Sequence, residues 1–147
     1  MTKVFNTMAK KPVPRPTRRA ASSQPTETEL ELLEVLWEHG PCPMGRLHEI
    51  YSATRESGYT TTQKMIQVMR DKGLVTADST VRPPLYSASE PQERTQRKLL
   101  DYLAQKAFGG SAKALILSAV SGDRLSKEEL SEIKRRISRA EKEGGKT

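Results

Sequence analysis

The stretch from Tyr59 to Val75 constrains the fold of this chain more than any other segment. Apolar side chains recur along it at helical spacing, which predicts an amphipathic helix that buries Thr62, Met65, Ile66 and Met69. The first residues carry hydroxyl groups suited to capping the start of that helix, and Gly73 stops it before a short strand. The stretch therefore predicts a helix with one buried stripe that runs directly into β structure.

The opposite face of this helix carries groups that can recognise DNA. The side chains that the spacing leaves on that face are Thr60, Thr61, Lys64, Gln67 and Val68. Hydroxyl, amide and ammonium groups on an exposed helix can hydrogen-bond base edges and phosphates when the helix lies in a major groove. Lysine and glutamine are also ordinary surface residues, so a plain solvated helix is the competing interpretation.

Two further helices are expected before this one. A capping-box pattern at Thr26 and Glu29 places the start of the first, and Gly40-Pro41 should end it sharply. The side chains it should turn inward are Leu30, Leu33, Leu36 and Trp37. A second helix should start near Pro43, and the side chains it should bury are Met44, Leu47, Ile50 and Tyr51.

Two β-prone pieces follow the helix and predict a hairpin. They cover 75–77 and 81–87, with a polar turn between them. Pro83 and Pro84 must lie at an edge or a bulge, because proline has no N–H to donate to a ladder. Arg82, the only base in the hairpin, is the candidate wing contact to DNA, although an exposed edge residue explains it equally well. Three helices followed by a hairpin is the order of a winged helix-turn-helix.

The C-terminal third predicts three more amphipathic helices. They should start at Pro91, at Ser111 and at a second capping box that begins with Ser126. A set of this size has little core of its own, so pairing with a second copy is the economical arrangement. Packing onto the chain's own first domain is the alternative. The candidate dimerisation side chains are Leu99, Leu103, Leu115, Ile116, Ile133 and Ile137.

Positive charge is concentrated at the N-terminus. Residues 1–25 hold six bases and no acid, and they supply most of the chain's net charge of +7. Such an arm binds polyanions of any sequence through counterion release, or it is a solvated leader. We therefore expect a disordered basic arm at 1–25, a winged-helix domain at 26–89, a helical dimerisation region at 90–142 and a disordered tail at 143–147.

No catalytic, metal or cofactor site is expected. His39 and His48 lie at a helix end and on a polar helix face, and their spacing builds no ligand set. Cys42, the single cysteine, has no histidine placed to activate it and suits a reducing cytosol. The acids of the first helix are expected to form a solvated face favoured by the helix dipole: Glu27, Glu29, Glu31 and Glu34. Without a long apolar run or an N-terminal apolar signal region, we expect a cytoplasmic protein that does not enter a membrane and is not an enzyme.

With this architecture, the chain resembles the penicillinase-repressor family, the BlaI/MecI/CopY transcriptional regulators. The resemblance extends from about Thr26 to about Ala140 and rests on the order and spacing of several segments. These segments are Glu29–Trp37, Tyr59-Thr60-Thr61, Asp71–Val75, Tyr86, Phe108–Ser111 and Leu125–Leu130. The resemblance implies a homodimeric winged-helix repressor that covers a palindromic DNA operator and dimerises through 91–142. It implies DNA contacts at the matching positions, Thr60, Thr61, Lys64, Gln67 and Arg82.

The chain also departs from this family. Penicillin-responsive relatives are inactivated by a membrane-bound sensor protease system that cuts an Asn-Phe bond, and the matching place here is Ser118-Ala119. Copper-responsive relatives carry a C-terminal cysteine cluster, which Cys42 alone cannot replace. Lys64 and Gln67 differ from the threonine and arginine often found there, so the operator sequence does not carry over.

The sequence supports one leading hypothesis and two alternatives. The leading hypothesis is a sequence-specific, dimeric DNA-binding repressor. A nonspecific architectural DNA-binding protein would instead bind mainly through the arm at 1–25. A protein-interaction module would use the winged fold and the acidic face of the first helix without binding DNA.

Overall fold

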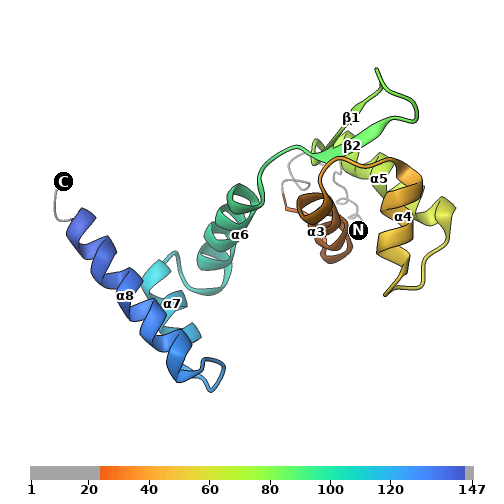
Figure 1. Cartoon of the computed structure of the whole chain (residues 1–147). Coiled ribbons are helices and arrows are strands. Elements are labelled where there is room, and N and C mark those ends of the chain that lie inside the picture. The colour runs from red at the N-terminus through yellow and green to blue at the C-terminus, as the bar shows by residue number, and fades with distance from the viewer. Residues whose placement is uncertain (1–23, 145–147) are drawn as a thin grey trace, which may run out of the picture. The chain divides into compact units, whose positions relative to one another are not determined.

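The computed structural model of the chain describes residues 24–144 (Figure 1). All but the last two residues of the basic arm predicted at 1–25 lie outside this range, as do residues 145–147 of the predicted tail. The described residues divide into two compact units, and the boundary in the chain falls between Gln96 and Arg97. Within 24–144, no helix is long and apolar enough to cross a membrane.

The N-terminal unit contains three helices followed by a hairpin. In chain order its elements are α3 (Glu27–His39), α4 (Met44–Ser52), α5 (Tyr59–Lys72), β1 (Val75–Asp78) and β2 (Leu85–Ala88). The two strands pair antiparallel, with Val75 opposite Ala88 and Asp78 opposite Leu85. This architecture confirms the predicted winged helix-turn-helix order. The second strand is shorter than predicted because residues 81–84, with their two prolines, form the connection instead.

The core of this unit lies between its helices and the base of the hairpin. Its buried side chains are Leu32, Leu33, Val35, Leu36, Cys42, Leu47, Tyr51, Ile66, Met69 and Val75. The stripe predicted for α5 is confirmed, because Thr62, Ile66 and Met69 are buried and Met65 packs against the core. One continuous cluster therefore includes residues from every helix of the unit and from the first strand.

The buried face of α3 is wider than predicted. Leu32 and Val35 are buried along with the two expected leucines, whereas Leu30 and Trp37 are only partly buried. The reason is that α3 packs against both α4 and β2. A helix covered on two sides buries a broader arc than the single stripe of a surface helix.

The helix ends of this unit follow two patterns. At α3 the predicted capping box is present, since Thr26 Oγ1 accepts the N–H of Glu29 at 3.2 Å and Glu29 Oε1 accepts that of Thr26 at 2.9 Å. The capping hydroxyl predicted for α5 is wrong. The helix begins at Tyr59, its N-cap is Gly58, and no side chain caps it. At the other end, Gly73 adopts a φ of 83°, the left-handed conformation expected of a glycine that stops a helix.

The C-terminal unit consists of most of α6 (Gln92–Ala107) with α7 (Ala112–Ser121) and α8 (Lys127–Gly144). Ser111 caps α7 by accepting the N–H of Ala114 at 2.9 Å. The predicted capping box of Ser126 and Glu129 starts α8, with both hydrogen bonds present. Among described residues 97–144, Ala104 is the only one that is buried. These helices therefore have well-formed ends but almost no core.

Candidate nucleic-acid interface

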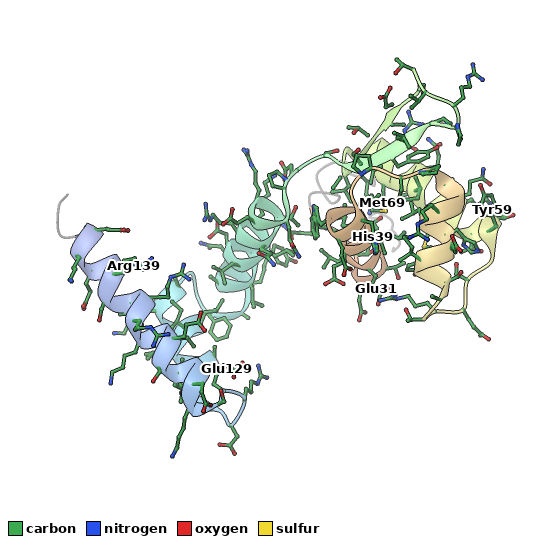
Figure 2. All side chains as sticks on the ribbon, in the orientation of Figure 1. Glu31, His39, Tyr59, Met69, Glu129 and Arg139 are labelled. Carbon is green, nitrogen blue, oxygen red and sulfur yellow. The ribbon has the colours of Figure 1, made fainter. Side chains whose placement is uncertain are left out.

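Helices α4 and α5, joined by the turn at 53–58, form a helix-turn-helix whose second helix has one buried and one exposed face. Figure 2 shows Met69 among the helices of the N-terminal unit and Tyr59 at its outer edge. The exposed face carries four of the five predicted DNA contacts, Thr60, Thr61, Lys64 and Gln67. The fifth, Arg82, is exposed in the connection between β1 and β2.

A buried threonine fixes the start of α5. Thr62 is completely buried, and its hydroxyl lies 2.9 Å from His48 Nδ1 and 3.2 Å from Ser57 Oγ. The same hydroxyl donates to the carbonyl of Gly58 at 3.3 Å. The imidazole of His48 also meets the ring of Tyr59 edge to face, with centroids 5.4 Å apart. The predicted polar helix face therefore does not describe the surroundings of His48, which contacts Thr62 and Tyr59 of α5.

A buried ion pair fixes the end of α5. Lys72 Nζ lies 2.7 Å and 3.0 Å from the two carboxylate oxygens of Glu29, whose side chain is only 8% exposed. The carboxylate thus completes the capping box of α3 and binds the last turn of α5 at the same time. The prediction of a solvated acidic face is wrong for Glu29. Its orientation follows from its place beside the buried leucines of α3.

A second acid of α3 also has a structural partner. Glu31 pairs with Arg55 at 3.0 Å, and the guanidinium of Arg55 stacks over the ring of Tyr51 at 5.1 Å from its centroid. Burial, together with the nearby Glu31 carboxylate, raises the pKa of Tyr51. The phenol is therefore neutral at physiological pH, and the turn after α4 is held against α3.

The hairpin is attached to the helices at its base. The N–H of Cys42 donates to the carbonyl of Tyr86 at 3.1 Å, and that of Tyr86 donates to the carbonyl of Cys42 at 2.8 Å. The indole N–H of Trp37 donates to the carbonyl of Glu90 at 2.9 Å. Burial raises the pKa of the Cys42 thiol, although Arg46 acts in the opposite direction. Cys42 is thus a protonated core residue whose backbone extends the sheet.

The connecting turn of the hairpin is closed by one carboxylate. Asp78 Oδ1 accepts from the backbone N–H of Thr80 at 3.0 Å and also from its hydroxyl. These two hydrogen bonds, with the hydroxyl's contribution the larger, lower the pKa of Asp78. The turn that carries Arg82 is therefore shaped by a carboxylate that is ionised at neutral pH.

The two helices of the helix-turn-helix differ from α3, α7 and α8 at their N-termini. Neither α4, which follows Pro43, nor α5, which follows Gly58, has a side-chain cap. By contrast, hydroxyl side chains cap α3, α7 and α8. Uncapped first-turn N–H groups remain available to anions such as DNA phosphates, which the helix dipole favours.

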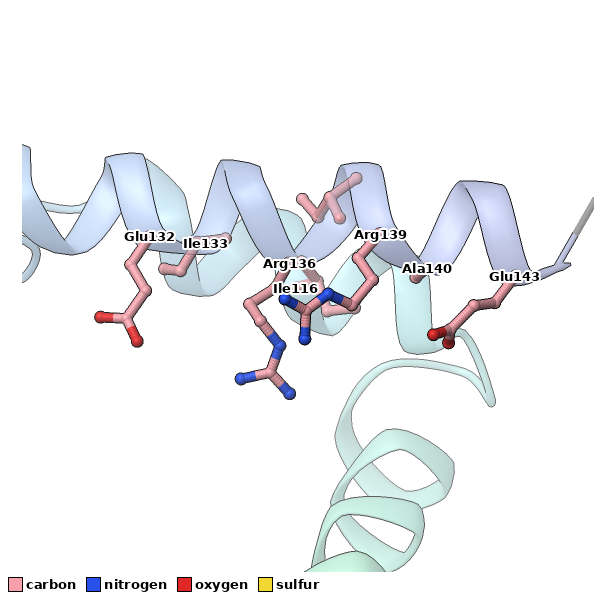
Figure 3. A pocket seen from close by; sticks show the side chains of 8 residues that line it. Ile116, Glu132, Ile133, Arg136, Arg139, Ala140 and Glu143 are labelled. Carbon is pink, nitrogen blue, oxygen red and sulfur yellow. The ribbon is translucent and has the colours of Figure 1, made fainter.

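The predicted dimerisation side chains lie on all three helices of the C-terminal unit. Ile116 from α7 and Ile133 and Ile137 from α8 line one open groove of ≈ 670 Å³. Figure 3 shows the side chains of its charged rim projecting from one side of α8; they are Glu132, Arg136, Arg139 and Glu143. Leu99 and Leu115 are partly buried and Leu103 is exposed, and none of the three lines the groove.

Four further apolar side chains of this unit are exposed but are not among the predicted dimerisation residues, namely Leu100, Tyr102, Leu117 and Leu130. Leu100 and Leu130 belong to the apolar stripes that the sequence predicts for these helices, whereas Tyr102 and Leu117 are neighbours of stripe residues in the sequence. Within residues 24–144, no three histidine, cysteine or acidic side chains are grouped so that they could hold a metal ion.

Three helices, a hairpin attached at its base and an exposed polar face on the third helix define a winged helix-turn-helix protein of the DNA-binding class. The sequence model of the penicillinase repressor family matches residues 25–139, most of the chain. The chain belongs to this family, as its sequence predicted, and the family is one of DNA-binding transcriptional repressors rather than enzymes. Among curated proteins, no match to the chain was found.

Proposed function

We propose that this chain is a sequence-specific repressor that binds a palindromic operator as a homodimer, with α5 in the major groove. The observation that carries the proposal is the structure of α5. Its polar face is exposed, whereas both of its ends are tied to the core, at Thr62 and at Lys72. A helix held at both ends presents its outward side chains in a defined register, which base reading requires.

The outward side chains supply chemistry that distinguishes bases. Lys64 can donate to the acceptor edge of guanine, and the amide of Gln67 can donate to and accept from adenine. The hydroxyls of Thr60 and Thr61 lie in the first turn, next to the uncapped N-terminus, where phosphates bind favourably. Arg82 on the hairpin connection would add a contact to the backbone beside the groove.

Dimerisation is proposed because the C-terminal helices leave their apolar side chains uncovered. Leu103, Ile116 and Ile137 are each about half exposed, at 47%, 49% and 50%. A two-fold partner would cover such surfaces and place two recognition helices on two half-sites of a palindrome. We do not expect cleavage by a sensor protease of the kind that acts on the penicillin-responsive relatives, since Ser118-Ala119 lacks the Asn-Phe pair and lies inside α7.

Operator recognition is tested by competition binding to DNA from the chain's own upstream region. We expect one palindromic site that resists an excess of random DNA. Lys64→Ala and Gln67→Ala should each weaken that site by about 1–3 kcal/mol and leave random DNA nearly unaffected. Gln63→Ala, an exposed change on the flank of the same helix, is the matched control.

Equal affinity for random DNA would overturn sequence-specific recognition. If deleting residues 1–25 then abolished binding while Lys64→Ala changed nothing, the nonspecific architectural alternative would hold. Absence of DNA affinity even at low ionic strength would favour the protein-interaction alternative, because phosphate contacts strengthen as salt falls.

The dimer is tested by light scattering at micromolar concentration. The wild-type chain should have twice the mass of one chain, and Ile116→Asp should give single chains and weaken operator binding. Ser118→Asp places the same charge on an exposed position of α7 that does not line the groove, and it should leave the dimer intact. A wild-type monomer would contradict the proposed dimer.

A further inference from the structure

Exposed apolar side chains are rare in the N-terminal unit and lie on the elements that would meet DNA. Among described residues 24–96, the large apolar side chains that remain exposed are Tyr59, Val68 and Val81. The first two belong to α5 and the third to the hairpin connection, and none belongs to α3 or α4. Val68 is 46% exposed and is not part of the core cluster of this unit.

Val68 lies in the proposed reading surface rather than beside the core. It follows Thr61 by seven residues and Lys64 by four, so the three side chains form one row along α5. Gln67 adjoins this row, and all four residues are exposed. The buried side chains Ile66 and Met69 occupy the other side of the same turns.

An exposed valine contributes little to the stability of this helix. Its branched side chain loses rotamer freedom in a helix, so valine is a poorer helix former than alanine. With about half of its surface open, it also gains little from burial. The fold therefore gives no reason for a valine at this position, whereas a ligand that offers an apolar group does.

We infer that Val68 is a specificity-determining residue whose isopropyl group contacts the 5-methyl group of a thymine in each operator half-site. The thymine methyl is the apolar feature of the major-groove edge, and apolar side chains recognise it by contact. Valine has no hydrogen-bonding group for guanine, adenine or cytosine edges and none for a phosphate. Lys64 and Gln67 would read the neighbouring bases by hydrogen bonds. The inference rests on the proposed function and names one base that the operator must contain.

The test removes only the methyl group. Each thymine of the operator is replaced in turn by deoxyuridine, in both half-sites together, and the affinity of the full chain is measured. At one position, wild-type affinity should fall about fourfold for each half-site, as expected for one buried methyl group. At that position Val68→Ala should bind the thymine and uracil operators equally, whereas Gln63→Ala should discriminate as the wild type does.

A thermal melt separates this role from a structural one. Val68→Ala should keep or raise the melting temperature, because alanine is the better helix former. If Val68→Ala discriminated thymine from uracil as strongly as the wild type, or if no thymine mattered to the wild type, the assignment of Val68 would be overturned while operator binding stood. If no operator were preferred over random DNA, the proposed function and this inference would fail together.

Discussion

The two units of this chain are built from similar helices, yet among the described residues only those of the N-terminal unit form a core. In the N-terminal unit, ten buried apolar side chains form one cluster, and the helix ends are tied together through Glu29, Lys72, Thr62 and His48. In the described part of the C-terminal unit, neither α7 nor α8 has a buried residue. The sequence signals for helices are thus equally clear in both units, but only the helices of the N-terminal unit pack around a shared core in the described residues.

This difference shows what each unit needs in order to be stable. Isolated helices shorter than about 12–15 residues are marginal in water, and α7 has 10 residues. A cap at Ser111 or Ser126 adds stability to a helix but cannot replace a covered apolar face. The N-terminal unit covers its own apolar side chains, whereas the described helices of the C-terminal unit leave theirs exposed, and the proposed dimer would cover them.

Truncation of a core leucine should give the largest effect on stability. Leu47 is completely buried, so Leu47→Ala should lower the free energy of unfolding of the N-terminal unit by about 2–5 kcal/mol. Leu117→Ala, in the other unit, removes a side chain that is 51% exposed and should change the stability of a single chain far less. Urea unfolding followed by circular dichroism measures both variants, at concentrations below those that support dimers. Equal losses would show that the contrast between the units is wrong.

Removal of the buried ion pair should have the next largest effect. Lys72→Ala leaves the carboxylate of Glu29 with only the Thr26 N–H as a partner, and we expect a loss of about 1.5–3 kcal/mol. Lys113→Ala, which removes an exposed lysine of α7, should be nearly neutral. The same urea experiment compares them, and a Lys72→Ala protein as stable as the wild type would mean that this pair does not hold α5.

The two capping boxes allow the units to be compared through the same chemistry. Thr26→Ala should reduce the unfolding free energy of the N-terminal unit by about 1 kcal/mol, because α3 is part of a cooperative core. Ser126→Ala removes the matching cap of α8. Because α8 has no buried residue, this change should only cause fraying at the start of that helix. Amide hydrogen exchange distinguishes the two results. Thr26→Ala should lower the protection of amides throughout the N-terminal unit, whereas Ser126→Ala should not.

The smallest expected effect is the pH response of the hairpin turn. The pKa of Asp78 is lowered in the folded state. Its contribution to the stability of the fold is therefore fully present at pH values above 3.8, the ordinary pKa of the group, and is lost as the pH falls through the lower pKa of the folded state. Thr80→Ala removes the hydroxyl donor and should raise this pKa toward the ordinary value. A carboxyl titration by NMR measures the shift, and an unchanged pKa would mean that the hydroxyl does not hold the turn.

Features set by near neighbours in the sequence were predictable. The capping boxes at Thr26 and Ser126 join residues three apart, and both are present. The helical stripe of α5 and its glycine stop also follow from local spacing. The order of helices and hairpin led to the correct fold and to the family.

Contacts between distant residues could not be predicted in this way. Glu29 and Lys72 are 43 residues apart, and Trp37 and Glu90 are 53 apart. Glutamates near the start of a helix have an adequate local explanation in the helix dipole, which hides a buried partner elsewhere. The exposure of Thr60, Thr61, Lys64, Gln67 and Arg82 agrees with their predicted role, but contact with DNA is a property of a complex and stays a prediction.

The hydrogen bond from Trp37 to the carbonyl of Glu90 has a spectroscopic consequence. Trp37 is the single tryptophan of the chain, and its indole is anchored where the hairpin returns to α3. Its emission therefore reports the integrity of the N-terminal unit and is insensitive to unfolding confined to residues 97–144. Of the four tyrosines, Tyr102 alone belongs to the C-terminal unit. The natural chromophores of this chain thus allow the two units to be followed separately, without any label.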